Sequence, residues 1–385
     1  MKPTVVLSVF NVANFPEGGG HFWVYMQYAL GLRQRGCDVY WLERFVRGQD
    51  PQRDALAIAT FFARMDAFGF GGKAILLAVS QAPDASPEPP QVLGMTRQDI
   101  DPLLRRADLL LNFHYRIDPE LLGRFRRTAL VDIDPGLFQF WMSRGQIRVP
   151  RHDHYFTTGE TVGTGSALIP DCGLPWVPIR PPVCLEEWPW EFDADLEAMT
   201  TISNWDSNNW VVDGESKYEN TKRVAFLGFK ELPMLTRQPL ELALFLRNPA
   251  DEDDRRLMER HGWRIRHSPE VAGTPDAYRT YIRRSRGEFS CAKRSCMEFQ
   301  NAWVSDRTLC YLASGKPVVV QHTGASRYLP NGAGMFRFTT IEEAAEAFEA
   351  INADYERHCR AARAIAESLF DAKQVTGRIL EVALG

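Results

Sequence analysis

Short apolar runs alternate with longer amphipathic stretches along most of the chain. Residues 4–10 are almost continuously apolar, as expected for a strand that is buried on both faces. Three consecutive glycines and an amphipathic stretch over 21–35 follow, and then a second apolar run over 38–43. This order predicts a strand, a glycine loop, a helix and a parallel strand, joined by a right-handed crossover.

The same alternation continues through the rest of the first half. Strands are predicted at 74–79, 108–113, 129–133 and 155–158, and helices at 55–66, 98–106 and 119–125. Alternating strands and helices indicate a doubly wound α/β sheet, in which ligands bind beyond the carboxyl ends of the strands. We therefore expect a binding site in the loops 11–21, 114–116 and 132–139.

The pattern changes between residues 170 and 190, where prolines are frequent and periodicity is lost. Alternation then resumes, with strands predicted at 199–203, 240–246, 264–267 and 288–290 and helices at 251–261, 275–284, 341–351 and 355–384. A chain of 385 residues is long enough to bury two cores. We predict a first domain over 1–170, a linker over 171–198, a second domain over 199–365 and a terminal helix over 366–385.

One segment of the second half combines a helix start, a tight turn, a buried strand and a further loop. Ser305 is a good N-cap residue, and Asp306 and Arg307 occupy the first turn of a short helix. Free backbone N–H groups at a helix start, with an arginine beside them, favour a bound anion such as a pyrophosphate. Thr323 and Gly324 lie in the loop after the strand, where a phosphate could also bind. An ordinary capped helix in a parallel sheet has the same pattern, so the segment alone leaves both interpretations open.

Basic residues gather before that helix, in the sequence SRGEFSCAKRSCMEF. Arg286, Lys293 and Arg294 are the basic residues of this stretch, and we expect them near the anion. Glu298 is an acid that could accept hydrogen bonds from ligand hydroxyls, as could Asp306. A solvated basic turn is the alternative interpretation.

Glycines in the first half permit a close approach of the backbone to a ligand. The triple glycine at 18–20 lacks the Gly-x-Gly-x-x-Gly spacing of dinucleotide-binding proteins, which disfavours a nicotinamide cofactor. Gly19 and Gly20 still follow a strand end, so we expect them to line a cleft, with a simple tight turn as the alternative.

Two polar side chains follow other strand ends of the first half. His114 comes after the apolar strand 108–113, and its imidazole could bond a sugar hydroxyl or a phosphate, or have a structural role. Asp132 lies at the end of the strand predicted over 129–133, and Asp134 follows it directly before Pro135. Asp134 is the better cleft candidate, while Asp132 is expected to cap a helix beginning near Pro135 or to bond to backbone.

The run Ala313-Ser314-Gly315-Lys316-Pro317-Val318-Val319 resembles the helix, turn and strand with which GT-B glycosyltransferases bind the diphosphate of a nucleotide sugar. The resemblance implies two Rossmann-like domains that face a cleft, with C-terminal helices crossing back to the first domain. The donor would be held mainly by the second domain and the acceptor by the first. In the retaining group 1 type family that the chain most resembles, two glutamates stand where this chain has Ala302 and Cys310, which indicates a divergent branch.

The resemblance also implies roles for the candidate residues. It places a lysine and an arginine near the leaving diphosphate, where fixed cations stabilise developing charge without a metal. The catalytic candidates are His114, Asp134, Lys293 and Arg294. The donor-binding candidates are Gly19, Gly20, Arg286, Glu298, Ser305, Asp306, Arg307, Thr323 and Gly324. We expect no cofactor beyond the nucleotide-diphosphate sugar and no metal, although the Asp-x-Asp spacing of residues 132–134 is one by which other glycosyltransferases hold a metal.

Composition narrows the class of partner. The 45 basic and 49 acidic residues give a net charge of −4, which argues against nucleic acid as a bulk electrostatic partner and leaves a small-molecule, lipid-linked or glycan acceptor. The seven cysteines are scattered, as in a protein of a reducing compartment, and their spacing does not favour a zinc site. The first residues lack a secretory pattern and no apolar run is long enough to span a bilayer, so we expect a cytoplasmic protein without a transmembrane segment.

Two other classes of protein fit the same layout. A sugar-nucleotide epimerase would use the same diphosphate pocket without an acceptor. A non-enzymatic two-lobed binding protein would also clamp a ligand between α/β lobes, although the lack of an export signal counts against it. The paired carboxylates of a glycosidase have no recognisable counterpart.

Overall fold

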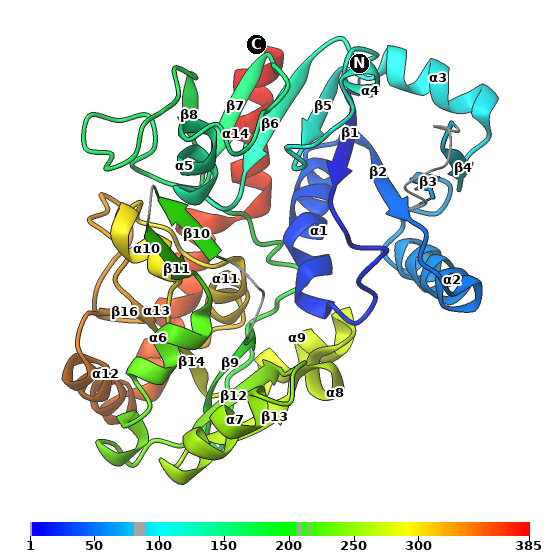
Figure 1. The fold of residues 1–385 in the computed structure, drawn as a ribbon. Coiled ribbons are helices and arrows are strands. Elements are labelled where there is room, and N and C mark those ends of the chain that lie inside the picture. The colour runs from blue at the N-terminus through cyan, green and yellow to red at the C-terminus, as the bar shows by residue number, and fades with distance from the viewer. Residues whose placement is uncertain (1, 81–88, 206–209, 214–215) are drawn as a thin grey trace.

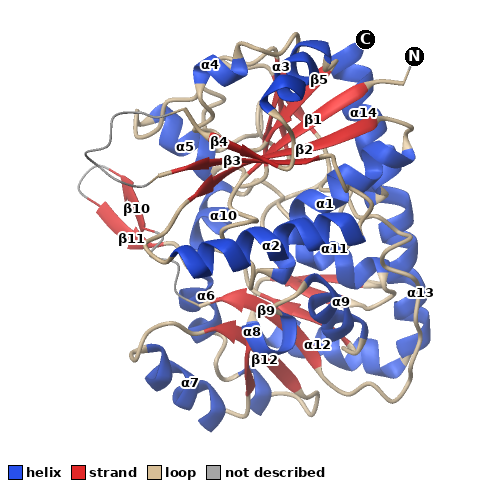
Figure 2. Cartoon of the chain, turned by 90° about the vertical axis from the view of Figure 1, so that its right-hand side faces the viewer, coloured by secondary structure: helices blue, strands red, loops and turns tan. Residues whose placement is uncertain are grey.

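A computed structural model describes residues 2–80, 89–205, 210–213 and 216–385. The described residues form two mainly parallel sheets whose carboxyl ends face each other, with helices between and around them (Figures 1 and 2). The central strands of both sheets arise where the sequence shows short apolar runs, and most of their residues are buried, whereas the edge strands are partly exposed.

The first sheet has eight strands in the order β4-β3-β2-β1-β5-β6-β7-β8. Its strands are β1 Thr4–Val9, β2 Asp38–Val46, β3 Ala74–Val79, β4 Gln91–Leu93, β5 Leu109–Asn112, β6 Thr128–Asp132, β7 His154–Thr157 and β8 Trp176–Pro178. All neighbours are parallel except β3 and β4. Its helices are α1 Gly19–Gln34, α2 Pro51–Ala67, α3 Arg97–Arg106, α4 Pro119–Leu122 and α5 Leu137–Ser143.

The second sheet has six parallel strands in the order β13-β12-β9-β14-β15-β16. They are β9 Met199–Asn204, β12 Leu240–Phe245, β13 Arg264–His267, β14 Gly287–Ser290, β15 Val318–Gln321 and β16 Met335–Phe338. The helical segments are α6 Lys222–Gly228, η1 Leu232–Met234, α7 Asp251–Arg260, α8 Ser268–Ala272, α9 Pro275–Arg283, α10 Arg294–Phe299, α11 Asp306–Ala313 and α12 Ile341–Ala353. A two-stranded hairpin, β10 Trp210–Asp213 and β11 Ser216–Glu219, lies between β9 and α6.

Part of the proline-rich segment assigned to a linker forms β8, which the sequence analysis missed. β8 is the edge strand of the first sheet, where Pro178 needs no outer hydrogen-bonding partner. Its three residues are too few to show a period in the sequence.

The predicted helix over 355–384 is broken into α13 Tyr355–Ile365, the wide turn η2 Ala366–Phe370 and α14 Ala372–Leu384. The break occurs where Val183 bonds to the carbonyl of Phe370 and to the N–H of Ala372. It turns α14 onto α1, where Gly31 lets the backbone of Ala372 approach, since a Cβ there would lie 2.6 Å from the Ala372 carbonyl oxygen. The C-terminal helix therefore ends beside the first sheet, as predicted (Figure 1).

Candidate active site

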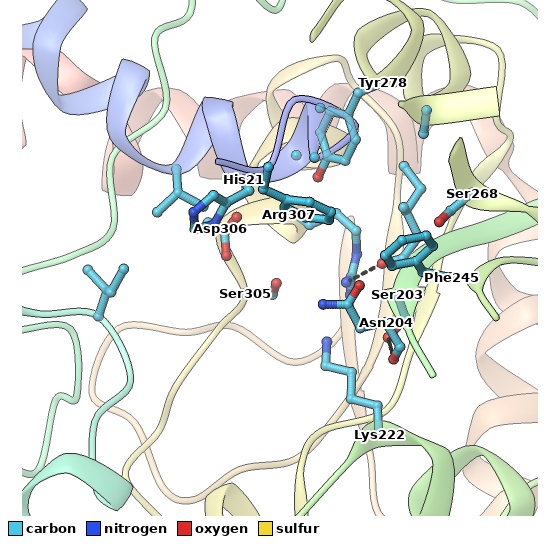
Figure 3. A pocket seen from close by; sticks show the side chains of 18 of the residues that line it. His21, Ser203, Asn204, Lys222, Phe245, Ser268, Tyr278, Ser305, Asp306 and Arg307 are labelled. Carbon is cyan, nitrogen blue, oxygen red and sulfur yellow. Dashed lines mark hydrogen bonds between the residues drawn. The ribbon is translucent and has the colours of Figure 1, made fainter. Parts of the chain in front are cut away.

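A cleft of about 730 Å³ lies where the carboxyl ends of the two sheets meet. Its lining comes from both halves of the chain: the start of α1, the loop after β6, the ends of β9 and β12, and the starts of α6 and α11 (Figure 3). The charged and hydroxyl-bearing residues among its walls are Glu17, Asp134, Ser203, Lys222, Ser268, Tyr278, Lys293, Ser305, Asp306 and Arg307.

The glycines of the first loop line this cleft, as the sequence analysis expected, and packing between the two halves explains their lack of side chains. A Cβ on Gly19 would lie 2.4 Å from the carbonyl oxygens of Ala272 and Thr274. A Cβ on Gly20 would lie 2.6 Å from the ring of Tyr278. These glycines therefore let the N-terminus of α1 sit directly against the second half of the chain, at the cleft floor.

The N-terminus of α11 opens into the same cleft. Ser305 is its N-cap and its side chain makes no capping hydrogen bond, so the hydroxyl is available to a ligand. Asp306 is enclosed beside His21 of α1, and burial raises the pKa of its carboxyl (Figure 3). An anion at this helix start would meet free backbone N–H groups, while the carboxylate can accept bonds from hydroxyls.

Arg307 is not available as the free cation that the sequence predicted. Its Nε donates to Glu288 at 2.7 Å, and its other nitrogens donate to the carbonyl of Ile202 and the hydroxyl of Ser290. The two side chains of the ion pair are 7% and 0% exposed, so Arg307 forms part of the cleft wall while its ion pair with Glu288 is buried. Arg307 therefore braces β9, β14 and α11, and its charge is neutralised by Glu288.

Lys222 is the cation that the sequence analysis missed. It begins α6 and extends into the cleft with its ammonium group toward Asn204 and Arg307 (Figure 3). Among the described residues it has no hydrogen bond or ion pair, and its Nζ lies 5.6 Å from the ring centre of Trp303. Burial, and then repulsion from Arg307, lowers its pKa to about 7.

Lys293 also reaches the cleft, where it meets a carboxylate from the other half of the chain. Its Nζ lies 3.5 Å from Asp134 Oδ2, and that carboxylate raises the pKa of the lysine. Asp134 is positioned by Asp132, whose Oδ1 accepts its N–H at 3.0 Å. The predicted local role of Asp132 thus agrees with the structure. Burial raises the pKa of the Asp132 carboxyl to about 6, and the side-chain amide of Gln139 donates a hydrogen bond to that carboxyl.

Three candidates lie away from the cleft. Arg286 precedes β14 and therefore stands at the amino end of the strand, where it bonds to the carbonyl of Leu196 and covers the ring of Tyr355. Arg294 and Glu298 pair with each other at 2.7 Å on the exposed face of α10. Lys293 and Arg294 precede α11 as expected, but they also begin a short helix that was not predicted. They are the N-cap and first residue of α10, and consecutive residues there point in different directions.

Thr323 and Gly324 support a cleft wall without lining the cavity. The hydroxyl of Thr323 donates to the carbonyl of Trp303 at 2.6 Å. A Cβ on Gly324 would lie 2.4 Å from the carbonyl oxygen of Gln300, so only glycine fits there. Both residues hold the loop that presents Trp303 to the cleft.

His114 lies at the carboxyl edge of the first sheet, as predicted, but outside the cleft lining. Its ring is stacked on Phe10, with 4.8 Å between ring centres. Burial, followed by repulsion from Arg44 and Arg116, lowers its pKa to about 4. The imidazole is therefore neutral at pH 7.

Within the described ranges, no group of three or more His, Cys, Asp or Glu side chains is placed to hold a metal ion. No helix of the described chain is both long and apolar enough to cross a bilayer.

No protein-family model and no curated protein matches the sequence. Solved structures match the fold over its whole length. An alpha-glucosyltransferase in complex with UDP-glucose and DNA containing an abasic site superposes with a TM-score of 0.61 at 11% identity, covering 100% of both chains. The E. coli protein described as trehalose-6-phosphate bound with UDP-2-fluoro glucose gives 0.55 at 10% identity, over 99% of this chain and 98% of that one. Alr3699/HepE of Anabaena, in complex with UDP and glucose, gives 0.53 at 11% identity, over 99% of each chain. Likeness at this identity shows the fold, and the predicted GT-B fold is confirmed.

Proposed function

We propose that this GT-B chain is a glycosyltransferase that moves a sugar from a nucleotide-diphosphate donor to an acceptor, without a metal ion. The observation that carries the proposal is Lys222, a cation with no acidic partner among the described side chains, enclosed in a cleft between two sheets. Lys222 is half-buried. A cation that is partly removed from water and has no counter-ion favours binding of an anion, because the anion offsets the cost of its desolvation. The neighbours solved with UDP or UDP-sugars support a nucleotide donor.

The cleft offers three sources of positive potential for a diphosphate. Lys222 approaches from one side, Lys293 lies in the same cavity, and the N-terminus of α11 supplies free N–H groups at Ser305. As the bond between the sugar and the diphosphate breaks, negative charge grows on the leaving group, and fixed cations that are already in place stabilise it. Asp306 is placed to accept hydrogen bonds from hydroxyls of the donor.

Asp134 contributes to the site by its ion pair with Lys293. The ion pair joins the loop after β6 to the start of α10 and so connects the two halves across the cleft. Asn301 adds a second link nearby, since its Nδ2 donates to the carbonyl of Pro135 at 2.5 Å. These contacts hold the acceptor-side sheet close to the proposed donor site.

A sugar-nucleotide epimerase and a non-enzymatic binding protein remain the rival functions. Both would bind a ligand in this cleft, but neither transfers a sugar to a second molecule. The acceptor class stays open, because one neighbour was solved with DNA while the net charge of this chain is −4.

We expect one of UDP, GDP or dTDP to raise the melting temperature of the protein in the presence of EDTA. Ligand bound only to the folded state stabilises it by RT ln(1 + [L]/Kd), about 2.7 kcal/mol at a hundredfold excess over Kd. Differential scanning fluorimetry with each nucleotide measures the shift, and release of the nucleoside diphosphate from its sugar conjugate, with and without EDTA, measures the reaction. Failure of all three nucleotides to shift the transition would refute the proposal. Loss of the reaction in EDTA, restored by magnesium or manganese, would refute its metal-free form.

Lys293 and Arg294 form a matched pair of neighbours for mutagenesis. We expect Lys293→Ala to lower kcat on the order of tenfold, because it removes a cation from the cleft. Arg294→Ala should change kcat by less than about twofold, because Arg294 pairs with Glu298 at the surface. Steady-state kinetics on both variants, with melting temperatures as the folding control, test this. Equal effects of the two changes would contradict the placement of Lys293 in the reacting site.

A further inference from the structure

Three neighbouring strands of the first sheet end in a row of side chains that the proposed donor site does not use. Arg44 lies near the end of β2, and Phe10 and His114 come just after β1 and β5. The three are in register, each two positions beyond the row of Leu42, Ser8 and Asn112. Residues an even number apart share a face of a sheet, so the three side chains lie on one face at its carboxyl edge. We call Arg44, Phe10, His114 and the adjoining Tyr115 and Arg116 the edge row.

The rings of the edge row form a flat stack with one open end. Phe10 and His114 are nearly parallel, at 21° and 4.8 Å, and His114 and Tyr115 at 23° and 6.2 Å. Phe10 is 50% exposed, so the stack ends in an accessible ring face. Such a face favours stacking with another ring.

The edge row also carries the positive charge of two arginines. Arg44 and Arg116 are exposed, and neither makes an ion pair within the described part of the chain. Arg116 covers the ring of Tyr115 at 5.7 Å, which holds its guanidinium at the end of the stack. The positive charges of both arginines lower the pKa of His114, in addition to burial, and so help to keep its imidazole neutral. This surface therefore attracts an anionic group.

The backbone beneath the stack is held in place. The side chain of Asn112 is fully buried, accepts from the N–H of His114 at 3.0 Å and donates to its carbonyl oxygen at 3.0 Å. It also donates to Nε2 of His152 at 3.0 Å, and that histidine is fixed by the carbonyl of Pro150. A surface that is already ordered loses little entropy when a ligand binds.

The edge row is continuous with the cleft. Nε2 of His21 donates to the carbonyl of Phe10 at 2.7 Å, and His21 lines the cleft beside Asp306. A molecule stacked on Phe10 therefore lies against the mouth of the proposed donor site, on the side of the first sheet.

We propose that the edge row binds the acceptor, and that the acceptor is a small molecule whose aromatic or sugar ring carries a phosphate or carboxylate group. This inference rests on the proposed function, and it names the substrate class for the same site. The ring stacks on Phe10 and the anion pairs with Arg44 or Arg116.

Binding of matched charged and neutral probes tests the inference on the full chain. The probes are phenyl phosphate against phenol, benzoate against benzyl alcohol, and glucuronate against glucose, each titrated calorimetrically in the presence of the saturating nucleoside diphosphate. The nucleotide occupies the cations of the cleft, so the probes report anion binding outside it, and the variants below assign that binding to the edge row. We expect the charged member of at least one pair to bind about tenfold more tightly than its neutral partner. The first two pairs report an aromatic ring and the third a sugar ring.

Variants locate the binding. The double change Arg44→Gln and Arg116→Gln should abolish the preference for charge, and Phe10→Ala should weaken both members of a pair. Arg105→Gln is the matched control, because Arg105 is an exposed arginine of α3 and lies outside the edge row. Equal affinities within all three pairs, or an unchanged preference in the double variant, would overturn the inference. So would salt-dependent binding of a short thymidine oligonucleotide with no binding of the small anions. Failure of the proposed function differs from all of these, because it appears as the absence of nucleotide binding.

Discussion

Replacement of Lys222 by alanine is expected to lower kcat/KM for sugar transfer on the order of a hundredfold. The reason is that Lys222 is the cleft cation without an acidic partner among the described residues, so its charge is available to the leaving diphosphate. Removal of one such preorganised electrostatic contact costs about 3 kcal/mol in the transition state. Steady-state kinetics with the donor identified by the nucleotide screen measure the effect.

Lys230→Ala is the matched control for this change. Lys230 lies on the surface beyond the end of α6, where its ammonium lies 3.8 Å from Glu231. We expect the kcat/KM of Lys230→Ala to stay within about twofold of that of the unchanged protein, since exposed ion pairs contribute little to stability. If Lys222→Ala had a normal rate and a normal melting temperature, the proposed function would be contradicted, because it depends on the charge of Lys222.

Nucleotide affinity should depend on pH through the same lysine. The pKa of Lys222 is lowered to about 7 in the unliganded cleft, and a bound diphosphate favours its charged form and raises that pKa. Binding then takes up a proton, so affinity falls as pH rises above about 7. Lys222→Arg should remove this dependence, because arginine stays charged. Calorimetric titration between pH 6 and 9, which are about one unit below and two above that pKa, compares the two proteins, and an equal pH dependence would exclude Lys222 as the titrating group.

Replacement of Arg307 by alanine is expected to destabilise the fold by about 3–5 kcal/mol. This change leaves Glu288 buried without its cation, and Oε2 of Glu288 already has no hydrogen-bond partner in the structure described. Removing one member of a buried pair is costly because the other charge remains desolvated. The melting temperature should fall on the order of 10 °C, measured by scanning calorimetry.

The double variant Arg307→Leu with Glu288→Leu separates this cause from simple loss of packing. It removes both charges together, so most of the lost stability should return. If Arg307→Ala melted at the normal temperature, the buried pair would not stabilise β9, β14 and α11 as described.

The sequence by itself determined the order and type of most elements, because each is encoded by a local period. The strand predicted at 74–79 coincides with β3, and the strand predicted at 264–267 coincides with β13. The helix start at Ser305 is local as well, since an N-cap is chosen by neighbouring residues. Strand direction also follows from the sequence. Because ligands bind beyond the carboxyl ends of the strands, strand direction would have excluded Arg286, which precedes β14, from the binding site. It would have retained Lys293, which follows β14.

Only the tertiary structure decided which charges are free and where the helices turn. Arg307 is neutralised by a glutamate from another element, whereas Lys222, unremarkable in the sequence, is enclosed without a partner among the described residues. The break before α14 depends on hydrogen bonds with Val183, far away in the chain. The edge row exists because three strands are paired in register near their carboxyl ends. Local periods encode elements, but burial, ion pairing and register are set by residues distant in sequence, so they emerge only when the chain is folded.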